Sequence, residues 1–183
     1  MKNIVLSILA LLVMGFTIDK SSDIKTARFD KTKSTITYTM THPLHTWDGV
    51  SKDVDGVVQL DATTGKILKV AAVAKISSFD SKNSNRDSHV IEVTEAIKYP
   101  IVSFVTTAVK DEGATLEVIG KITFHNQIKE VRFVATSKKE EKKRMLMGSF
   151  IVLLEDFNIE RPSLMMVKTA NEMKMAFYLE FNY

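Results

Sequence analysis

The histidines are the side chains of this 183-residue chain with the clearest chemical potential. His42 and His45 have the His-x-x-His spacing of some metal sites, and Asp48 or His125 could complete a set of three ligands. Zinc sites usually need three or four protein ligands. Because the pair flanks Pro43 in a segment expected to be a loop, we expect no metal and no protein-bound cofactor.

Motifs of the common enzyme classes are absent from the sequence. It has no Gly-x-Ser-x-Gly elbow, HExxH, P-loop or dinucleotide fingerprint. It also has no Cys, which excludes a thiol nucleophile, a disulfide framework and a lipoprotein anchor. The sequence therefore predicts a non-catalytic protein, with a hydrolase or metal protein using His42, His45 or His89 as the minor alternative.

The charge pattern gives no sign of a nucleic-acid partner. The chain has 25 basic and 22 acidic residues, so its net charge is only +3. A nucleic-acid binder normally concentrates basic residues in one stripe. The dense run at 138–144 is mixed in sign and predicts a solvated hairpin tip, with an anionic partner or membrane surface as the alternative.

The first residues resemble a secretory leader. Lys2 precedes an apolar run at 4–14, which is shorter than the ~20 residues needed to span a bilayer. We predict a signal peptide over 1–22, with cleavage after Gly15, and a periplasmic or extracellular protein. An uncleaved membrane anchor is the alternative.

The remaining chain alternates apolar and polar residues, which is typical of strands with one buried face. Alternating segments lie at 35–40, 53–61, 68–76, 116–124, 131–135 and 173–182, and turn signals lie at 61–65, 111–113 and 125–126. Residues 84–96 break this pattern and predict a short helix capped by Ser84 or Asn85, while 155–170 reads as a long connection. We therefore predict an all-β, lipocalin-like antiparallel barrel of about eight strands with one short helix; a sandwich is the alternative.

Several motifs resemble the YceI-like family of secreted, lipocalin-like polyisoprenoid-binding proteins. They are Phe29-Asp30 before Ser34-Thr35-Ile36, Val54-Asp55-Gly56, Arg86-Asp87-Ser88-His89-Val90, Tyr99-Pro100-Ile101-Val102-Ser103-Phe104, the strand 118–125 and Arg161. The resemblance covers 26–183 and assigns 23–183 to one barrel domain. It implies an extended barrel around an apolar channel, with a bound polyisoprenoid or quinone-like lipid. The chain departs from the family pattern at 40–49 and 92–98, which bears on the ligand more than on the fold.

Inward-facing positions of the strands are the candidate ligand contacts. Small residues such as Ala72, Ala74, Gly120 and Ala135 leave space, whereas inward phenylalanines fill it, so alternation alone does not separate a lined channel from a filled core. The resemblance favours a channel with an apolar lining of Tyr38, Met40, Val58, Leu60, Val70, Ala72, Ala74, Phe104, Val118, Phe133, Phe150, Val152, Met175 and Phe177.

A polar mouth would contact the headgroup of such a lipid. The candidates are His42, Arg86, His89 and Arg161, although the sequence favours a local Arg86–Asp87 ion pair and a hydrogen-bonded structural role for His89. Trp47 could lie at the rim or plug one end.

The resemblance, together with the leader and the inward apolar faces, implies a carrier that holds a long isoprenoid- or quinone-like lipid without covalent chemistry. The alternative is a filled barrel that acts as a secreted protein-interaction module. The apolar stretch 145–154 leaves a homodimer open, and a transient membrane contact is a further expectation.

Overall fold

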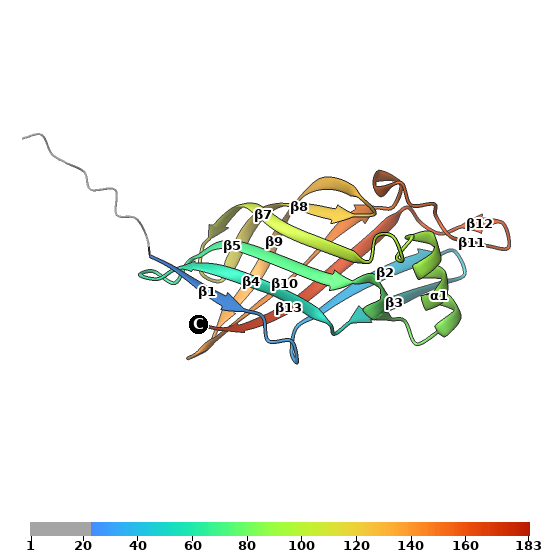
Figure 1. Cartoon of the computed structure of the whole chain (residues 1–183). Helices are drawn as coiled ribbons and strands as arrows, with labels where there is room; N and C mark the ends of the chain where they lie inside the picture. The colour runs from blue at the N-terminus through green and yellow to red at the C-terminus, as the bar shows by residue number, and fades with distance from the viewer. Residues whose placement is uncertain (1–22) are drawn as a thin grey trace, which may run out of the picture.

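The computed structural model describes residues 23–183, and the predicted signal peptide at 1–22 lies outside the described residues (Figure 1). The elements are β1 (Ile24–Arg28), β2 (Thr35–His42), β3 (His45–Ser51), β4 (Val54–Asp61), β5 (Ile67–Lys75), η1 (Ile76–Ser78), β6 (Phe79–Asp80), α1 (Ser84–Val93), β7 (Ile101–Asp111), β8 (Thr115–Phe124), β9 (Gln127–Lys139), β10 (Lys143–Leu153), η2 (Glu155–Phe157), β11 (Ser163–Leu164), β12 (Val167–Lys168) and β13 (Glu172–Asn182). Among these residues, no helix is long and apolar enough to cross a membrane.

Eleven strands form one curled antiparallel sheet, in the order β1-β4-β5-β7-β8-β9-β10-β13-β2-β3-β6 (Figure 1). Phe29 brings two sides of the curl together, because its amide donates to Gly56 O on β4 and it forms a bridge with Phe181 on β13. The predicted all-β, lipocalin-like class with a single helix is confirmed.

The predicted number of eight strands was wrong. Three additional strands of the sheet lie in segments with little hydrophobic alternation: β1, β3, which was expected to be a loop, and the two-residue β6. The turn between β2 and β3 contains only Pro43 and Leu44, so His42 and His45 are cross-strand partners. Their His-x-x-His spacing therefore comes from a tight hairpin.

Helix α1 lies across one end of the barrel (Figure 1). Its cap is Asn83, whose side chain accepts a hydrogen bond from the Arg86 amide, and the predicted caps Ser84 and Asn85 are instead inside the first turn. The helix ends at Val93, earlier than predicted. The Thr94 hydroxyl bonds back to a carbonyl of the last turn, which helps to end the helix there.

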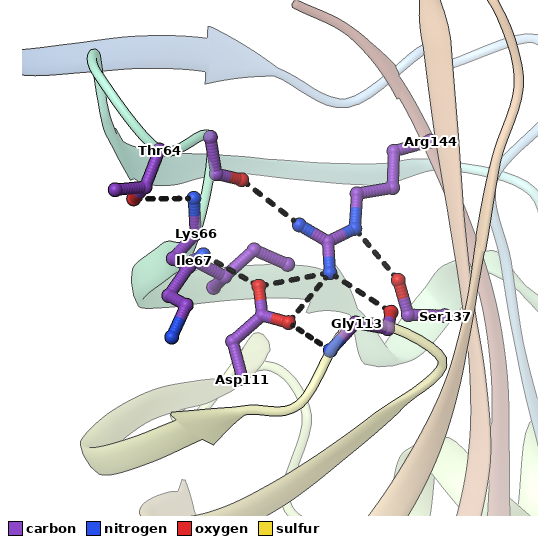
Figure 2. A network of polar contacts seen from close by, with 8 residues as sticks. Thr64, Lys66, Ile67, Asp111, Gly113, Ser137 and Arg144 are labelled. Carbon is purple, nitrogen blue, oxygen red and sulfur yellow. Dashed lines mark hydrogen bonds and ion pairs between the residues drawn. The ribbon is translucent and has the colours of Figure 1, made fainter.

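The opposite end of the barrel is closed by a buried polar network (Figure 2). The Arg144 side chain is fully buried; its Nη2 donates to both Asp111 oxygens at 2.8 and 3.0 Å, its Nη1 to Gly65 O at 3.1 Å and its Nε to Ser137 Oγ at 2.6 Å. The prediction that 138–144 forms a solvated tip was therefore wrong for Arg144. Arg144 occupies an inward-facing position of β10, where its side chain meets the Asp111 carboxylate that neutralises its charge.

The apolar core is divided between the two ends of the barrel. One buried cluster lies near the Arg144 network and includes Phe29, Val58, Leu60 and Phe181. The second lies beneath α1 and η2 and includes Tyr38, Met40, Val152, Phe157 and Met175. Ile36 and Phe104 pack against both clusters, so they mark the region where the clusters meet.

Candidate ligand-binding cavity

A cavity of about 170 Å³ lies inside the barrel. Its walls come from both core clusters, from Trp47 and Met40 at the α1 end to Leu116 and Leu146 near the opposite end. Nearly all of these side chains are apolar; Thr94, Ser103 and Thr106 are among the few polar ones. A single apolar cavity thus borders both clusters, and its walls suit an apolar molecule.

Most of the predicted lining residues border this cavity. They are Tyr38, Met40, Val70, Ala72, Phe104, Val118, Phe133, Phe150, Val152, Met175 and Phe177. Val58, Leu60 and Ala74 do not, although all three are buried. Val58 and Leu60 pack in a buried cluster with Ala27 and Phe29, in the part of the sheet where β4 pairs with β1. Alternation predicted which face of the sheet they occupy, but not whether that face meets packed side chains or the cavity.

Four phenylalanines narrow the middle of the cavity. The Phe133 ring lies 5.8 Å from Phe104, 4.9 Å from Phe150 and 5.6 Å from Phe177, measured between ring centroids. Gly120 was expected to leave space, but the Phe104 ring fills it: a Cβ on Gly120 would lie 2.4 Å from that ring. The interior is therefore a narrow channel, and rotation of these rings would control its width.

Several lining residues lie in segments that showed no alternation. Val90 and Val93 reach the cavity from α1, and Ile159 and Pro162 reach it from the connection after η2. The apolar side of the helix is visible in the sequence as Val90, Ile91 and Val93. The connection gives no periodic signal, because its residues do not form a regular strand.

Two buried polar atoms at the α1 end have no hydrogen-bond partner. They are the Tyr38 hydroxyl and Trp47 Nε1, and both side chains border the cavity. Burial raises the pKa of the Tyr38 phenol above its usual value; the nearby Trp47 indole opposes this rise without meeting hydrogen-bond geometry. An unpaired buried polar group is costly, so this end is suited to a ligand atom that supplies the missing bond.

Arg161 and Thr169 carry the other unpaired buried polar atoms of residues 23–183, Arg161 Nε and Thr169 Oγ1. Arg161 Nη1 lies 3.5 Å from Glu155 Oε1, so its charge is partly balanced. Pro162 adjoins Arg161 and borders the cavity, and its carbonyl accepts a hydrogen bond from the Thr169 amide. The unsatisfied atoms thus gather around the connection and α1, away from the Arg144 end.

The four predicted mouth residues differ in their surroundings. The Arg86 guanidinium lies 4.8 Å above the Trp47 ring, beside the cavity wall. Asp87 accepts from the Ser81 amide, so the Arg86–Asp87 pairing considered from the sequence is replaced by these contacts. Arg86 and Arg161 are therefore placed near the cavity end.

His42 and His89 do not border the cavity. His42 is buried; its Nδ1 accepts from the Leu44 amide at 3.2 Å and its Nε2 lies 3.1 Å from Val167 O, an arrangement that places the ring hydrogen on Nε2. Both ring nitrogens are thus used within the protein. His89 is on the exposed side of α1, where its Nδ1 lies 3.2 Å from Glu92. Residues 23–183 contain no cluster of three or more potential metal ligands.

Comparison with known proteins places the chain in a family. The sequence model of the YceI-like domain matches residues 28–181. The chain belongs to the YceI-like domain family. The expected resemblance is confirmed.

Curated relatives and solved structures agree with this assignment. A UPF0312 protein of Pseudomonas fluorescens is 34% identical over 123 residues, which are 62% of this chain and 64% of the relative. A UPF0312 protein of Pseudomonas putida is 36% identical over 97 residues, 51% of this chain and 50% of the relative. The matches thus span between half and two thirds of these relatives.

Two solved structures share the fold of this YceI-like chain. Burkholderia cenocepacia BcnA has a TM-score of 0.74 at 20% identity, covering 83% of this chain and 98% of that one. A polyisoprenoid binding domain from Saccharophagus degradans has a TM-score of 0.71 at 10% identity, covering 87% and 99%. At these identities, the similarity concerns the architecture alone.

Proposed function

We propose that this YceI-like protein is a non-catalytic carrier that holds a long isoprenoid- or quinone-like lipid inside the barrel. The observation that carries the proposal is the apolar cavity, whose lining includes residues from Trp47 at the α1 end to Leu146 near the opposite end. Burial of apolar surface would supply affinity without directional bonds. The polyisoprenoid binding domain of Saccharophagus degradans, which has the same architecture, is consistent with this ligand class.

The polar head of the ligand would lie at the α1 end and the tail would point toward Arg144. Trp47 Nε1 and Arg161 Nε can only donate hydrogen bonds, so a head that satisfies them must carry acceptor oxygens. Acidic groups balance the nearby cations: Arg161 lies beside Glu155, and Arg86 and Asp87 shift the pKa of Tyr38 in opposite directions. This balance of charge favours a neutral acceptor, such as a carbonyl, over a phosphate.

Export is part of the proposal and depends on the leader-like segment at 4–14. A periplasmic or extracellular carrier would have to move its ligand through water between membranes. An enclosed apolar cavity meets that need, because it removes the lipid tail from solvent.

Organic extraction of the purified protein, followed by mass spectrometry, tests the proposal. We expect an apolar molecule in the extract, and we expect protein stripped of it to take up long-chain isoprenoids. An extract without any apolar molecule, together with no uptake, would overturn the carrier function and leave the protein-interaction module as the better explanation.

A homodimer through 145–154 remains a prediction. Leu146 borders the cavity and Met145 is buried, whereas Ile151 and Leu153 are exposed on the outer face of β10. A stable interface usually buries on the order of 1,000 Å² or more, so these two side chains would need neighbouring strands to contribute. Light scattering of the purified protein measures the oligomeric state directly.

A further inference from the structure

The β11–β12 hairpin carries an exposed apolar tip. Met165 and Met166 form its turn with 81% and 95% of their surface exposed, and Leu164 and Val167 on either side are each 45% exposed. Figure 1 shows that this hairpin projects beyond the barrel at the end where α1 lies. We define Leu164, Met165, Met166 and Val167 as the methionine tip.

The backbone of this tip is unfavourable for its residues. Met165 and Met166 have φ values of 51° and 63°, in the left-handed region that Asn, Asp and Gly normally occupy in two-residue hairpin turns. Buried side chains can compensate for such a conformation, but these two make little contact with the described chain. The tip therefore combines a strained turn with exposed hydrophobic side chains, and contact with an apolar surface would bury them.

The methionine tip is attached to the end of the barrel that carries the unpaired polar atoms. His42 Nε2 lies 3.1 Å from Val167 O, and the Thr169 amide donates to Pro162 O at 2.8 Å. Pro162 borders the cavity, and Leu44, on the neighbouring β2–β3 turn, is 67% exposed. An apolar surface that contacts the tip would therefore lie close to the mouth of the cavity.

A lipid bilayer fits this tip better than a protein partner does. The tip is a small convex projection, whereas stable protein interfaces extend over much larger complementary surfaces. Arg161 and the exposed Lys168 flank it, and residues 161–168 contain no acidic side chain that phosphate headgroups would repel. A few apolar side chains inserted at the interface would give weak, reversible membrane binding.

We propose that the methionine tip inserts into the interfacial region of a lipid bilayer and holds the cavity mouth against the membrane. This inference rests on the proposed function for its purpose, since a carried lipid must be taken from a bilayer. The hairpin would then be the docking element of the carrier, and Met165 and Met166 its anchors.

A fluorescent probe on the full chain tests insertion locally. The chain has no Cys, so Met166→Cys provides a single site for an environment-sensitive label such as NBD, and Ile24→Cys on β1 provides a matched exposed apolar site near the opposite end. Both proteins are mixed with vesicles of phosphatidylcholine and phosphatidylglycerol at 7:3. We expect a blue shift and quenching by brominated lipid at position 166 only, which separates tip insertion from any binding through the leader.

No shift at position 166 in vesicle-bound protein, or equal shifts at both positions, would overturn the inference. A shift that depends on protein concentration and needs no lipid would also overturn it, in favour of contact between two copies. The double variant Met165→Asn/Met166→Gly keeps residues suited to the turn and removes the apolar tip. We expect it to take up ligand normally from detergent solution but several-fold more slowly from vesicles.

These experiments separate the two proposals. Position 166 could insert in a protein from which no lipid is ever extracted; that result would support docking and overturn the carrier function. Conversely, a protein that yields lipid on extraction but shows no insertion at position 166 would retain the carrier function without this docking element.

Discussion

Arg144 on β10 and Asp111 on β7 form a fully buried ion pair across the two strands that lie between β10 and β7 in the sheet. The Asp111 carboxylate also accepts from the Ile67 and Gly113 amides, so the pair connects β5, β7 and β10 at one end of the barrel (Figure 2). It fixes the closed end of the cavity by polar contacts.

Replacement of Arg144 by Met should strongly destabilise the fold. The variant leaves the Asp111 carboxylate buried without its cation, a change that typically costs about 3–5 kcal/mol. Urea unfolding measures the difference. Arg132→Met is the matched control, because Arg132 pairs with Glu130 on the exposed surface, where such pairs contribute about 1 kcal/mol or less. Equal losses in both variants would contradict the importance of the buried pair.

The same pair predicts how stability depends on pH. Burial raises the pKa of Asp111, but the Ile67 and Gly113 amides and the Arg144 guanidinium outweigh it and hold the pKa below its usual value. A carboxyl with a lowered folded-state pKa stabilises the fold above its unfolded pKa of about 3.9, and this contribution disappears as the pH falls through the folded value. The stability difference between the native protein and Asp111→Asn should therefore shrink below about pH 4. A difference that grows on acidification would show the opposite linkage.

Ala72→Phe should lower the amount of lipid bound per protein. Ala72 borders the cavity opposite Phe104 on the neighbouring strand, so a larger ring would extend into the channel. Overpacking typically costs about 1–3 kcal/mol, which we expect to be small enough for the variant to fold. Val105→Phe adds the same ring on the exposed face of β7 and should load normally. A folded Ala72→Phe protein with unchanged lipid content would argue against the channel.

Phe133→Ala should create a site that apolar ligands stabilise. The Phe133 ring contacts three other phenylalanines, so its removal should cost about 3–5 kcal/mol in the empty protein and widen the channel. Added isoprenoid should then raise the melting temperature more than it does in the native protein. Phe29→Ala removes a buried ring that does not border the cavity and should show no such recovery.

Tyr38→Phe should stabilise the empty protein while weakening ligand binding. The Tyr38 hydroxyl is buried without a partner, and burial of such a group costs about 1–3 kcal/mol that the variant avoids. If the hydroxyl bonds to the ligand head, the variant should bind an isoprenoid quinone more weakly, but a hydrocarbon such as squalene equally well. Titration calorimetry or fluorescence compares the two ligands. Equal losses for both would show that the hydroxyl makes no specific contact.

The alternation of apolar and polar residues predicted the fold, and its limits explain which features of the cavity and of the Arg144 network were not predicted. Ala72 and Phe133 were correctly expected to face inward, because a buried face imposes a period of two on each strand. Alternation does not show which inward side chains pack against one another and which border a void, so Val58 and Leu60 could not be distinguished from cavity residues. Arg144 is inward in phase, but its charge suggested solvent; only the spatial position of Asp111, far away in sequence, accounts for its burial.

The candidate mouth was harder to predict because its geometry is set by hairpins. From the sequence, His42 was a candidate polar contact for a ligand. In the structure, its Nε2 is instead hydrogen-bonded to the Val167 carbonyl of the β11–β12 hairpin. Trp47, for which both a rim and a plug were considered, borders the cavity with Arg86 over its ring. His42 and Val167 are more than 100 residues apart in the sequence. Nothing in the local pattern of either segment indicates that they are in contact.

The buried Arg144–Asp111 pair has a consequence for the order of events during exchange. In the proposed carrier, the Arg144 network would block one end of the cavity, so a bound lipid would enter and leave at the α1 end. A lipid seated with its tail toward Arg144 would arrive tail foremost and depart head foremost. An acceptor protein or membrane would therefore contact the headgroup first, and could discriminate between lipids before the hydrocarbon tail left the cavity.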